Sequence, residues 1–163
     1  MSTDPRVLAD QFDPLLEASV AIEASPERVW SLVSDPLLMP RWSPQVWRVI
    51  QRRGHDSAVG SRYLNINRAG VLVWPTRSQV VEREPGRRFA WRIRDNKVVW
   101  SFTLSSDEPG QVTLTQRREA PQGVSDRALS LENRFMGGVP QFQDTLRADM
   151  KRTLAAIKAA AEA

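Results

Sequence analysis

The chain has 163 residues, the size of a single domain that can bury a core and still hold a cavity. Its composition is that of a globular protein, and no apolar run approaches the length that crosses a bilayer. The first residues lack the pattern of an export signal and cysteine is absent, so we expect a cytoplasmic protein without disulfides or thiolate metal sites.

The net charge of +4 is distributed unevenly along the chain. Residues 1–40 hold seven acidic and two basic residues, a net charge of −5, whereas residues 41–118 hold six acidic and fifteen basic residues, a net charge of +9. We expect the basic stretch to form a solvent-facing sheet surface, with an anionic partner such as nucleic acid or a lipid head group as the alternative. Because the basic residues alternate with apolar ones and form no dense run, we expect no nucleic-acid partner.

The beginning of the chain predicts a flexible arm followed by a strand. Residues 1–14 are polar and contain two prolines, so we expect an arm that precedes one domain over residues 15–163. Residues 16–23 alternate apolar and polar side chains, with Ala18, Val20 and Ile22 on one face, as a half-buried strand does.

Two helix-start signals follow this strand. Ser25-Pro26-Glu27 and Asp35-Pro36 each combine a capping side chain with a proline that suits the first helical turn. They predict one short helix after Ser25 and a second over residues 36–40. We expect Trp30 and Trp42 to pack these helices against the end of a sheet.

The middle of the chain predicts six more strands. Each candidate strand ends at a turn signal such as Pro-Gly or Ala-Gly, and the segments are 46–53, 62–68, 71–84, 88–94, 98–104 and 112–119. Short connections predict antiparallel neighbours. In the segment 88–94, Phe89, Trp91 and Ile93 alternate with arginines, which indicates a sheet with one apolar face and one arginine-rich face.

The end of the chain predicts a long helix over residues 139–163. Apolar residues recur at steps of three and four, which places them on one face: Val139, Phe142, Leu146, Met150, Leu154, Ile157 and Ala161. Gln143 and Arg147 fall on the other faces. We expect the apolar face to cover the apolar side of the sheet. The preceding segment, 124–136, predicts a short helix that acts as a lid or forms the first turn of the long helix.

Several motifs carry a resemblance to a known family. They are S-P-E-x-V-W (residues 25–30), D-P-x-x-x-P-x-W (35–42), E-P-G-R-R-F-A-W (84–91) and W-x-F-x-L (100–104). With the order of elements, they make residues 15–162 resemble the START-like, or Bet v 1-like (SRPBCC), superfamily, and within it the bacterial polyketide cyclase/dehydrase and lipid-transport group. The resemblance implies an α+β helix-grip fold: a seven-stranded curved antiparallel sheet around a long C-terminal helix, with two short helices after the first strand.

The resemblance also implies a cavity between sheet and helix that holds a hydrophobic small molecule such as a lipid, a polyketide or an aromatic compound. Aromatic rings and a few polar groups line such pockets. We therefore predict that the ligand contacts Tyr63, Asn65, Trp74, Thr76, Phe89, Trp91, Trp100, Phe102, Leu114, Gln116, Phe135, Phe142 and Leu146. Residue alternation leaves open whether Asn65 and Asn67, or instead Leu64 and Ile66, face the cavity, because a slip of one residue reverses the strand.

The sequence predicts no cofactor and no metal. With His55 as the single histidine and no cysteine, neither a transition-metal site nor a Ser/His/Asp triad is expected. Arg118 and Glu119, near the end of the last strand, and Glu132 and Arg134 are expected to form surface ion pairs, with a role in acid–base chemistry as the alternative.

Three functions remain open on the sequence alone. The preferred hypothesis is binding of an apolar small molecule. The second is a polyketide cyclase or dehydratase, which requires polar groups such as Asn65, Thr76, Gln116 and Arg118 to converge inside the cavity. The third is an interaction module, either a co-chaperone domain or a lipid carrier that uses the arginine-rich face. We expect no integral membrane association, and a homodimer is left open.

Overall fold

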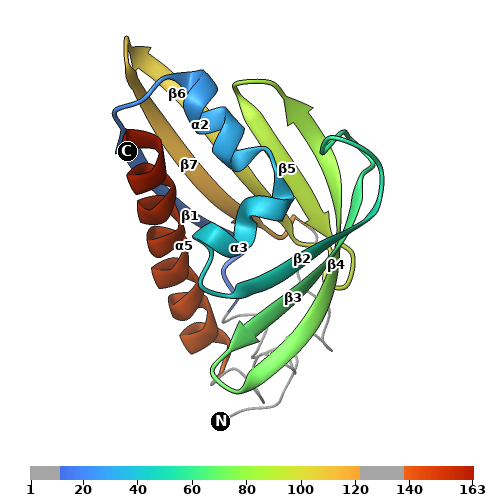
Figure 1. Ribbon diagram of the computed structural model, residues 1–163. Coiled ribbons are helices and arrows are strands. Elements are labelled where there is room, and N and C mark those ends of the chain that lie inside the picture. The colour runs from blue at the N-terminus through green and yellow to red at the C-terminus, as the bar shows by residue number, and fades with distance from the viewer. Residues whose placement is uncertain (1–11, 122–137) are drawn as a thin grey trace.

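The computed structural model describes residues 12–121 and 138–163. A curved sheet wraps around one long helix, and short helical segments cover one end of the sheet (Figure 1). The strands are β1 (Leu15–Ile22), β2 (Val46–Arg53), β3 (Arg62–Ala69), β4 (Leu72–Glu84), β5 (Arg88–Ile93), β6 (Val99–Glu108) and β7 (Gln111–Glu119). The helices are α2 (Pro26–Val33), the 3-10 helix η1 (Pro36–Leu38), α3 (Met39–Trp42) and α5 (Val139–Glu162).

The seven strands of the described residues form one antiparallel sheet in the order β1-β7-β6-β5-β4-β3-β2. From β2 to β7 each strand pairs with the next one along the chain, as the short turns require. The strand β1 pairs with β7, from Leu15 opposite Glu119 to Ile22 opposite Val112. The predicted helix-grip fold is therefore confirmed.

Two predicted boundaries differ from the structure by more than one residue. The strand β6 continues to Glu108 rather than ending at Leu104, because its polar end still pairs with β7 through an irregular register beyond Ser105. The second short helix divides into η1 and α3 and reaches Trp42. The Asp35 side chain caps η1 by accepting a hydrogen bond of 2.9 Å from the Leu37 backbone N–H, as the sequence signal indicated.

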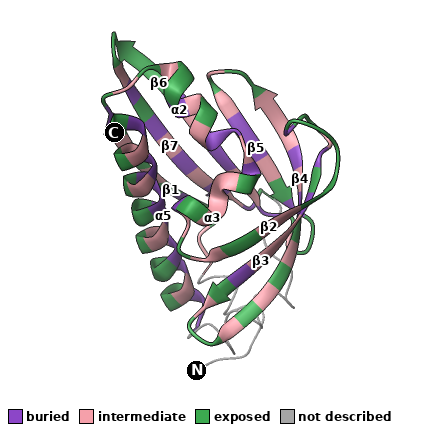
Figure 2. Cartoon of the chain, in the orientation of Figure 1, coloured by how far each residue is buried: buried purple, intermediate pink, exposed green. Residues whose placement is uncertain are grey.

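The core lies where α5 meets the inner face of the sheet. Met150, Leu154 and Ile157 of α5 are each at most 2% exposed, and they belong to the predicted apolar face of the helix. Leu154 and Ile157 pack in one cluster with Val112 and Leu114 of β7. Figure 2 shows the other side of α5 exposed to solvent. Burial of this face, rather than helix propensity, stabilises α5.

Gln143 is a correction to the predicted helix faces. The spacing placed it on an outer face, but it is 2% exposed and its amide hydrogen-bonds the main chain of Asp13. The Asp13 backbone N–H donates to Gln143 Oε1 at 3.0 Å, and Gln143 Nε2 donates to the Asp13 carbonyl at 3.3 Å. Arg147 adds an ion pair of 2.9 Å to the Asp13 carboxylate. The end of the predicted arm is therefore attached to α5, whereas residues 1–11 lie outside the described part of the chain.

We expect Gly54→Ala to destabilise the protein by about 1–3 kcal/mol more than Gly60→Ala. Both glycines have a positive φ near +95°, at +95° and +94°, so both substitutions carry the same backbone strain. A Cβ at Gly54 would lie 2.7 Å from Ser61 Cα, whereas a Cβ at Gly60 would meet nothing within 4 Å. Urea denaturation of the two variants measures the difference, and equal losses would contradict the expected clash.

Candidate ligand-binding site

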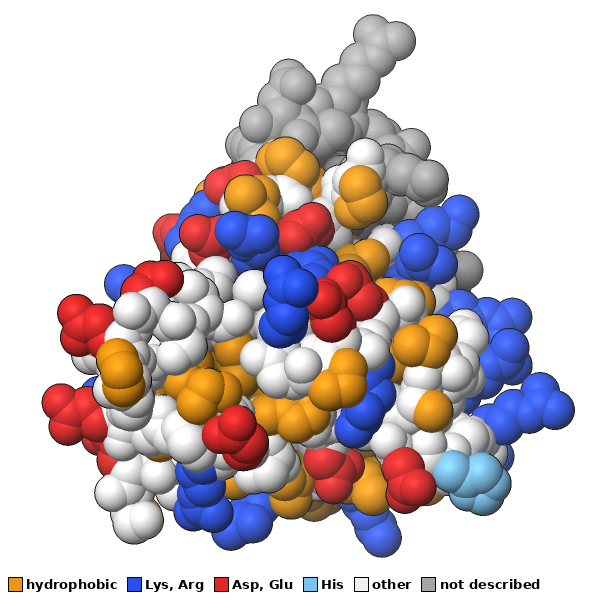
Figure 3. All heavy atoms as spheres, turned by 90° about the horizontal axis from the view of Figure 1, so that it is seen from above, with side chains coloured by type: hydrophobic (Ala, Val, Ile, Leu, Met, Phe, Trp, Pro, Cys, Tyr) orange, Lys and Arg blue, Asp and Glu red, His pale blue; other side chains and the backbone are white. Residues whose placement is uncertain are grey.

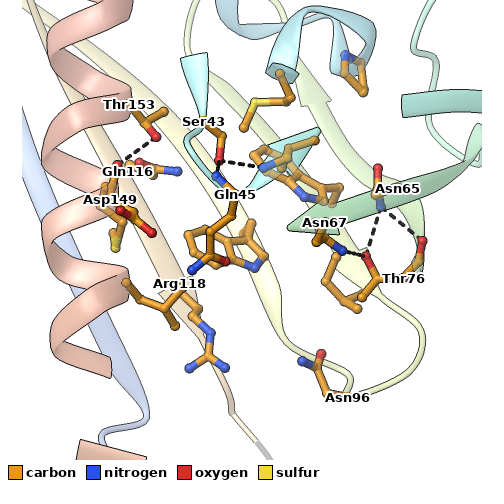
Figure 4. A pocket seen from close by; sticks show the side chains of 18 of the residues that line it. Ser43, Gln45, Asn65, Asn67, Thr76, Asn96, Gln116, Arg118, Asp149 and Thr153 are labelled. Carbon is orange, nitrogen blue, oxygen red and sulfur yellow. Dashed lines mark hydrogen bonds between the residues drawn. The ribbon is translucent and has the colours of Figure 1, made fainter. Parts of the chain in front are cut away.

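A cavity of about 620 Å³ lies between the sheet and α5. Its volume falls in the range of small-molecule sites. Figure 4 shows side chains from α5 and from the strands pointing into the same space. Leu146, Asp149, Met150 and Thr153 line the α5 side.

A step in the sheet shapes the opposite wall of the cavity. The strand β5 ends at Ile93, which pairs with Ser78 of β4, so residues 72–76 of β4 pair with β3 alone. Proline suits this unpaired edge because it has no N–H to donate, and Pro75 occupies it. Trp74 and Pro75 therefore border the cavity together with Asn96, from the turn after β5.

Aromatic side chains form much of the apolar lining: Trp74, Phe89, Trp91, Trp100 and Phe142. The rings of Phe89 and Trp91 lie 5.9 Å apart between centroids. Phe89 is also fixed from behind by Trp30 of α2, edge-on at 6.3 Å. Ring pairs at these distances attract one another, which holds the wall in place. Such a wall suits a flat apolar ligand, on whose faces rings can stack.

The sequence left open which face of β3 points into the cavity. In the structure, the face that carries the asparagines does. Asn65 and Asn67 line the cavity, whereas Leu64 and Ile66 alternate with them on the other face. Asn67 Nδ2 donates to Thr76 Oγ1 at 3.0 Å, and Asn65 Nδ2 donates to Ser78 Oγ at 3.0 Å (Figure 4). These bonds connect β3 to β4 and orient both amides along the cavity wall.

A second polar group lies on β7 and α5. Gln116 and Arg118 are 3% and 4% exposed, and both line the cavity. The Gln116 Oε1 atom is buried without a hydrogen-bond partner among the described residues. The Arg118 guanidinium lies 5.5 Å from the ring centroid of Phe12. A buried acceptor without a partner costs free energy, so Gln116 favours a bound group that can donate a hydrogen bond.

The Asp149 carboxyl on α5 faces the same space. Burial raises its pKa above the ordinary value for aspartate, while the Gln45 amide and the Arg152 guanidinium act in the opposite direction. Arg152 Nη1 lies 3.9 Å from Asp149 Oδ1. Asp149 was not predicted as a site residue, because its position beside the apolar stripe of the helix looks like an exposed flank.

We expect Asp149→Asn to stabilise the protein relative to the native sequence, increasingly as pH rises. A folded-state pKa above the unfolded one means that the folded chain holds the proton more tightly. The carboxyl therefore costs stability once it ionises, and the cost is complete above the raised pKa. Melting temperatures of both proteins from pH about 3 to about 7 measure the divergence. A constant difference across this range would contradict it.

The structure brings most of the predicted site residues together. Nine line the cavity: Asn65, Trp74, Thr76, Phe89, Trp91, Trp100, Gln116, Phe142 and Leu146. Tyr63, Phe102 and Leu114 are not among its lining residues. Each is at most 3% exposed, because core side chains rather than the cavity cover it. Phe135 lies outside the described residues, as do Glu132, Arg134 and the whole predicted lid.

Within 12–121 and 138–163, no cluster of three or more His, Asp or Glu side chains has metal-binding geometry. In the same ranges no helix is both long and apolar enough to span a membrane.

Arg118 was expected at the surface, but it lines the cavity. It is two residues after Gln116 in β7, so both side chains lie on the same face of the strand.

Solved structures with the same fold are similar to this chain at low sequence identity. One is the di-domain aromatase/cyclase StfQ from the steffimycin biosynthetic pathway, with a TM-score of 0.73 and 15% identity over 98% of this chain. The chain covers 54% of StfQ, about half of that two-domain protein. Protein CV1439 from Chromobacterium violaceum has a TM-score of 0.67 and 21% identity, and the match covers 93% of this chain and 99% of CV1439.

The Zhui aromatase/cyclase from Streptomyces sp. R1128 is also similar, with a TM-score of 0.63 and 16% identity over 91% of this chain and 93% of Zhui. A comparison with curated protein sequences finds no significant match. The curved sheet around one long helix, with a cavity between them, defines a helix-grip protein. Residues 14–162 match the profile described as polyketide cyclase / dehydrase and lipid transport, and the chain belongs to this family.

Proposed function

We propose that the chain binds a hydrophobic small molecule, such as a polyketide, an aromatic compound or a lipid, in the cavity between the sheet and α5. The observation that carries this proposal is the cavity of about 620 Å³ with five aromatic side chains on its wall. Apolar area removed from water supplies the affinity, and the few polar groups orient the ligand. Membership of a family described by cyclisation and lipid transport supports the same ligand classes.

Isothermal titration calorimetry with three apolar probes tests the proposal: naphthol, an anthraquinone and a fatty acid. We expect saturable binding of one molecule per chain for at least one of the three probes, with a negative heat-capacity change from apolar burial. Absence of saturable binding for all three probes would contradict the proposal.

A second candidate function is a cyclase or dehydratase acting on a polyketide-like substrate. It is favoured by one observation: all four polar residues that this hypothesis requires, Asn65, Thr76, Gln116 and Arg118, line the cavity. Arg118 supplies a positive charge that stabilises an enolate, and Asp149 supplies a carboxyl whose raised pKa suits proton transfer. The aromatase/cyclase neighbours StfQ and Zhui support the same chemistry.

A binding protein and a cyclase differ in whether a substrate is converted to product. A synthetic substrate with several alternating carbonyl groups, incubated with the protein, is expected to form an aromatic product faster than in buffer if the chain is a cyclase. Arg118→Gln should then lower that rate while binding of the apolar probe persists. A rate equal to that in buffer removes this candidate and leaves the binding function.

A further inference from the structure

A second surface of the molecule lies at the free end of the β3–β4 hairpin, outside the cavity. We call it the hairpin-end patch; its residues are Trp47, Arg48, Arg68, Val71 and Val73. Trp47 is 58% exposed, Val71 104% and Val73 49%, which is unusual for large apolar side chains. Both arginines are exposed as well. Apolar and basic side chains thus share one solvent-facing surface.

The register of the strands produces this patch. Arg68 lies directly opposite Val73 in the β3–β4 ladder. Trp47 occupies an irregular position of β2 between Val46 and Arg48, and the Arg68 guanidinium lies 5.4 Å from the Trp47 ring centroid. Val71 is in the turn that joins the two strands, after Gly70, whose φ is +58°. A hairpin tip of this kind projects its side chains away from the body of the sheet.

The strand segments that surround the patch carry charge of one sign. The strands β2 and β3 and residues 72–81 of β4 contain no acidic residue and six arginines, three in β2, two in β3 and one in β4: Arg48, Arg52, Arg53, Arg62, Arg68 and Arg77. Arg77 pairs with Asp95 at 2.7 Å, but the other five form no ion pair within the described residues. Figure 3 shows basic side chains along the right-hand side, beside the histidine of the β2–β3 loop, which lies at the end of β2 and β3 opposite the hairpin-end patch. An anionic partner complements such a surface.

The apolar members of the patch distinguish between anionic partners. A nucleic acid would be met by basic side chains in a groove or a dense run, with aromatic rings placed to stack on bases. Here the exposed tryptophan lies beside two valines at the hairpin tip, rather than beside further rings on which successive bases could stack. Tryptophan with flanking arginine is the combination found at the boundary between lipid head groups and acyl chains.

The patch also adjoins the cavity. Val46, Asn67 and Trp74 line the cavity, and each is the chain neighbour of a patch residue, namely Trp47, Arg68 and Val73. The patch is therefore the outer side of the same three strands that form one cavity wall. A partner surface bound to the patch would therefore lie close to one end of the cavity.

We propose that the hairpin-end patch docks the protein reversibly on an anionic phospholipid surface. Val71 and Trp47 enter the interface between head groups and acyl chains, and Arg48 and Arg68 contact lipid phosphates. This inference does not depend on the identity of the cavity ligand, and it does not require the cavity to bind anything.

Co-sedimentation with vesicles tests the proposal. One set contains phosphatidylcholine alone, and the other contains equal parts of phosphatidylcholine and phosphatidylglycerol. We expect binding to the anionic vesicles at low salt, weak binding to the neutral ones, and loss of most binding when the Debye length falls to about 3 Å at 1 M salt. Equal binding to both sets, or binding to neither, would overturn the proposal.

Matched charge reversals locate the surface. Arg68→Glu should weaken partitioning about twenty-fold, because each basic residue near an anionic surface contributes a factor of about five and the reversal changes two charges. Lys151→Glu makes the same charge change on the exposed side of α5 and should have little effect. Equal losses for both variants would overturn the assignment to the hairpin end. Binding to a DNA duplex but not to vesicles would overturn it in favour of a nucleic-acid surface.

A third variant separates the apolar contribution from charge. Trp47→Ser leaves all charges in place and should reduce partitioning several-fold at the salt concentration where the native protein binds half-maximally. If Trp47→Ser partitions like the native protein, the proposed insertion is wrong. Circular dichroism spectra of the three variants are expected to match that of the native protein, which shows that the fold is intact.

Discussion

Leu146→Trp is expected to weaken binding of a flat apolar ligand by about a hundred-fold or more, which corresponds to about 2.7 kcal/mol. Leu146 is 4% exposed and contributes to the cavity from the middle of α5. An indole at this position occupies space that the ligand would otherwise fill. The cavity of about 620 Å³ has room for the larger ring, so we expect the fold to persist.

The matched control for this substitution is Ala155→Trp. It introduces the same side chain on the same helix, but Ala155 is exposed on the solvent side of α5. We expect Ala155→Trp to bind the probe as tightly as the native protein. Calorimetry with the same probe measures both variants, and circular dichroism checks that each has folded. Tight binding by Leu146→Trp would place the ligand outside the cavity.

Phe102→Ala is expected to destabilise the protein by about 3–5 kcal/mol. Phe102 is fully buried, with 0% exposure, and its ring centroid lies 5.6 Å from that of Trp91. It packs in the cluster that joins the sheet to α5. Removing the ring leaves a void that the surrounding side chains fill only in part, and the loss of their contacts is the main cost.

Phe142→Ala serves as the comparison, because Phe142 is a cavity-lining ring of the same type. It is half-buried and already borders empty space, so its loss should cost about 1–2 kcal/mol. Conversely, Phe142→Ala should weaken ligand binding, whereas Phe102 has no contact with the cavity. Urea denaturation measures both free energies of unfolding. Equal destabilisation by the two substitutions would show that the division between core rings and cavity rings is wrong.

For the aromatic residues, the sequence predicted which face of the sheet they occupy but not which of them line the cavity. Trp91 and Phe102 both lie on the apolar face of the sheet, as alternation predicted, and their rings touch. Only one of them lines the cavity, because the position of α5 and α2 over the sheet decides which part of that face is covered. The alternation of residues in the sequence does not distinguish side chains that share one face of the sheet. The helices cover only part of that face, so some of these side chains lie in the core and others line the cavity.

For polar residues, residue periodicity predicted some inward positions correctly and missed others. The alternation of β7 predicted correctly that Gln116 points inward. Gln143 and Asp149 were not recognised, because a polar side chain beside the apolar stripe of a helix usually faces water. Gln143 is buried only because Asp13 arrives from a distant part of the chain to satisfy its amide.

The order of elements, the antiparallel sheet and the apolar face of α5 were all predictable from the amino-acid sequence. These features follow from local signals, namely caps, turns and periods of two or 3.6 residues, which act over a few neighbouring positions. The tertiary structure alone decided that a cavity exists, that Asn65 and Asn67 face it, and that Trp47 meets Arg68 at the hairpin end. Each of these depends on register and on the distance between packed elements. Both are set by contacts between residues far apart in the chain.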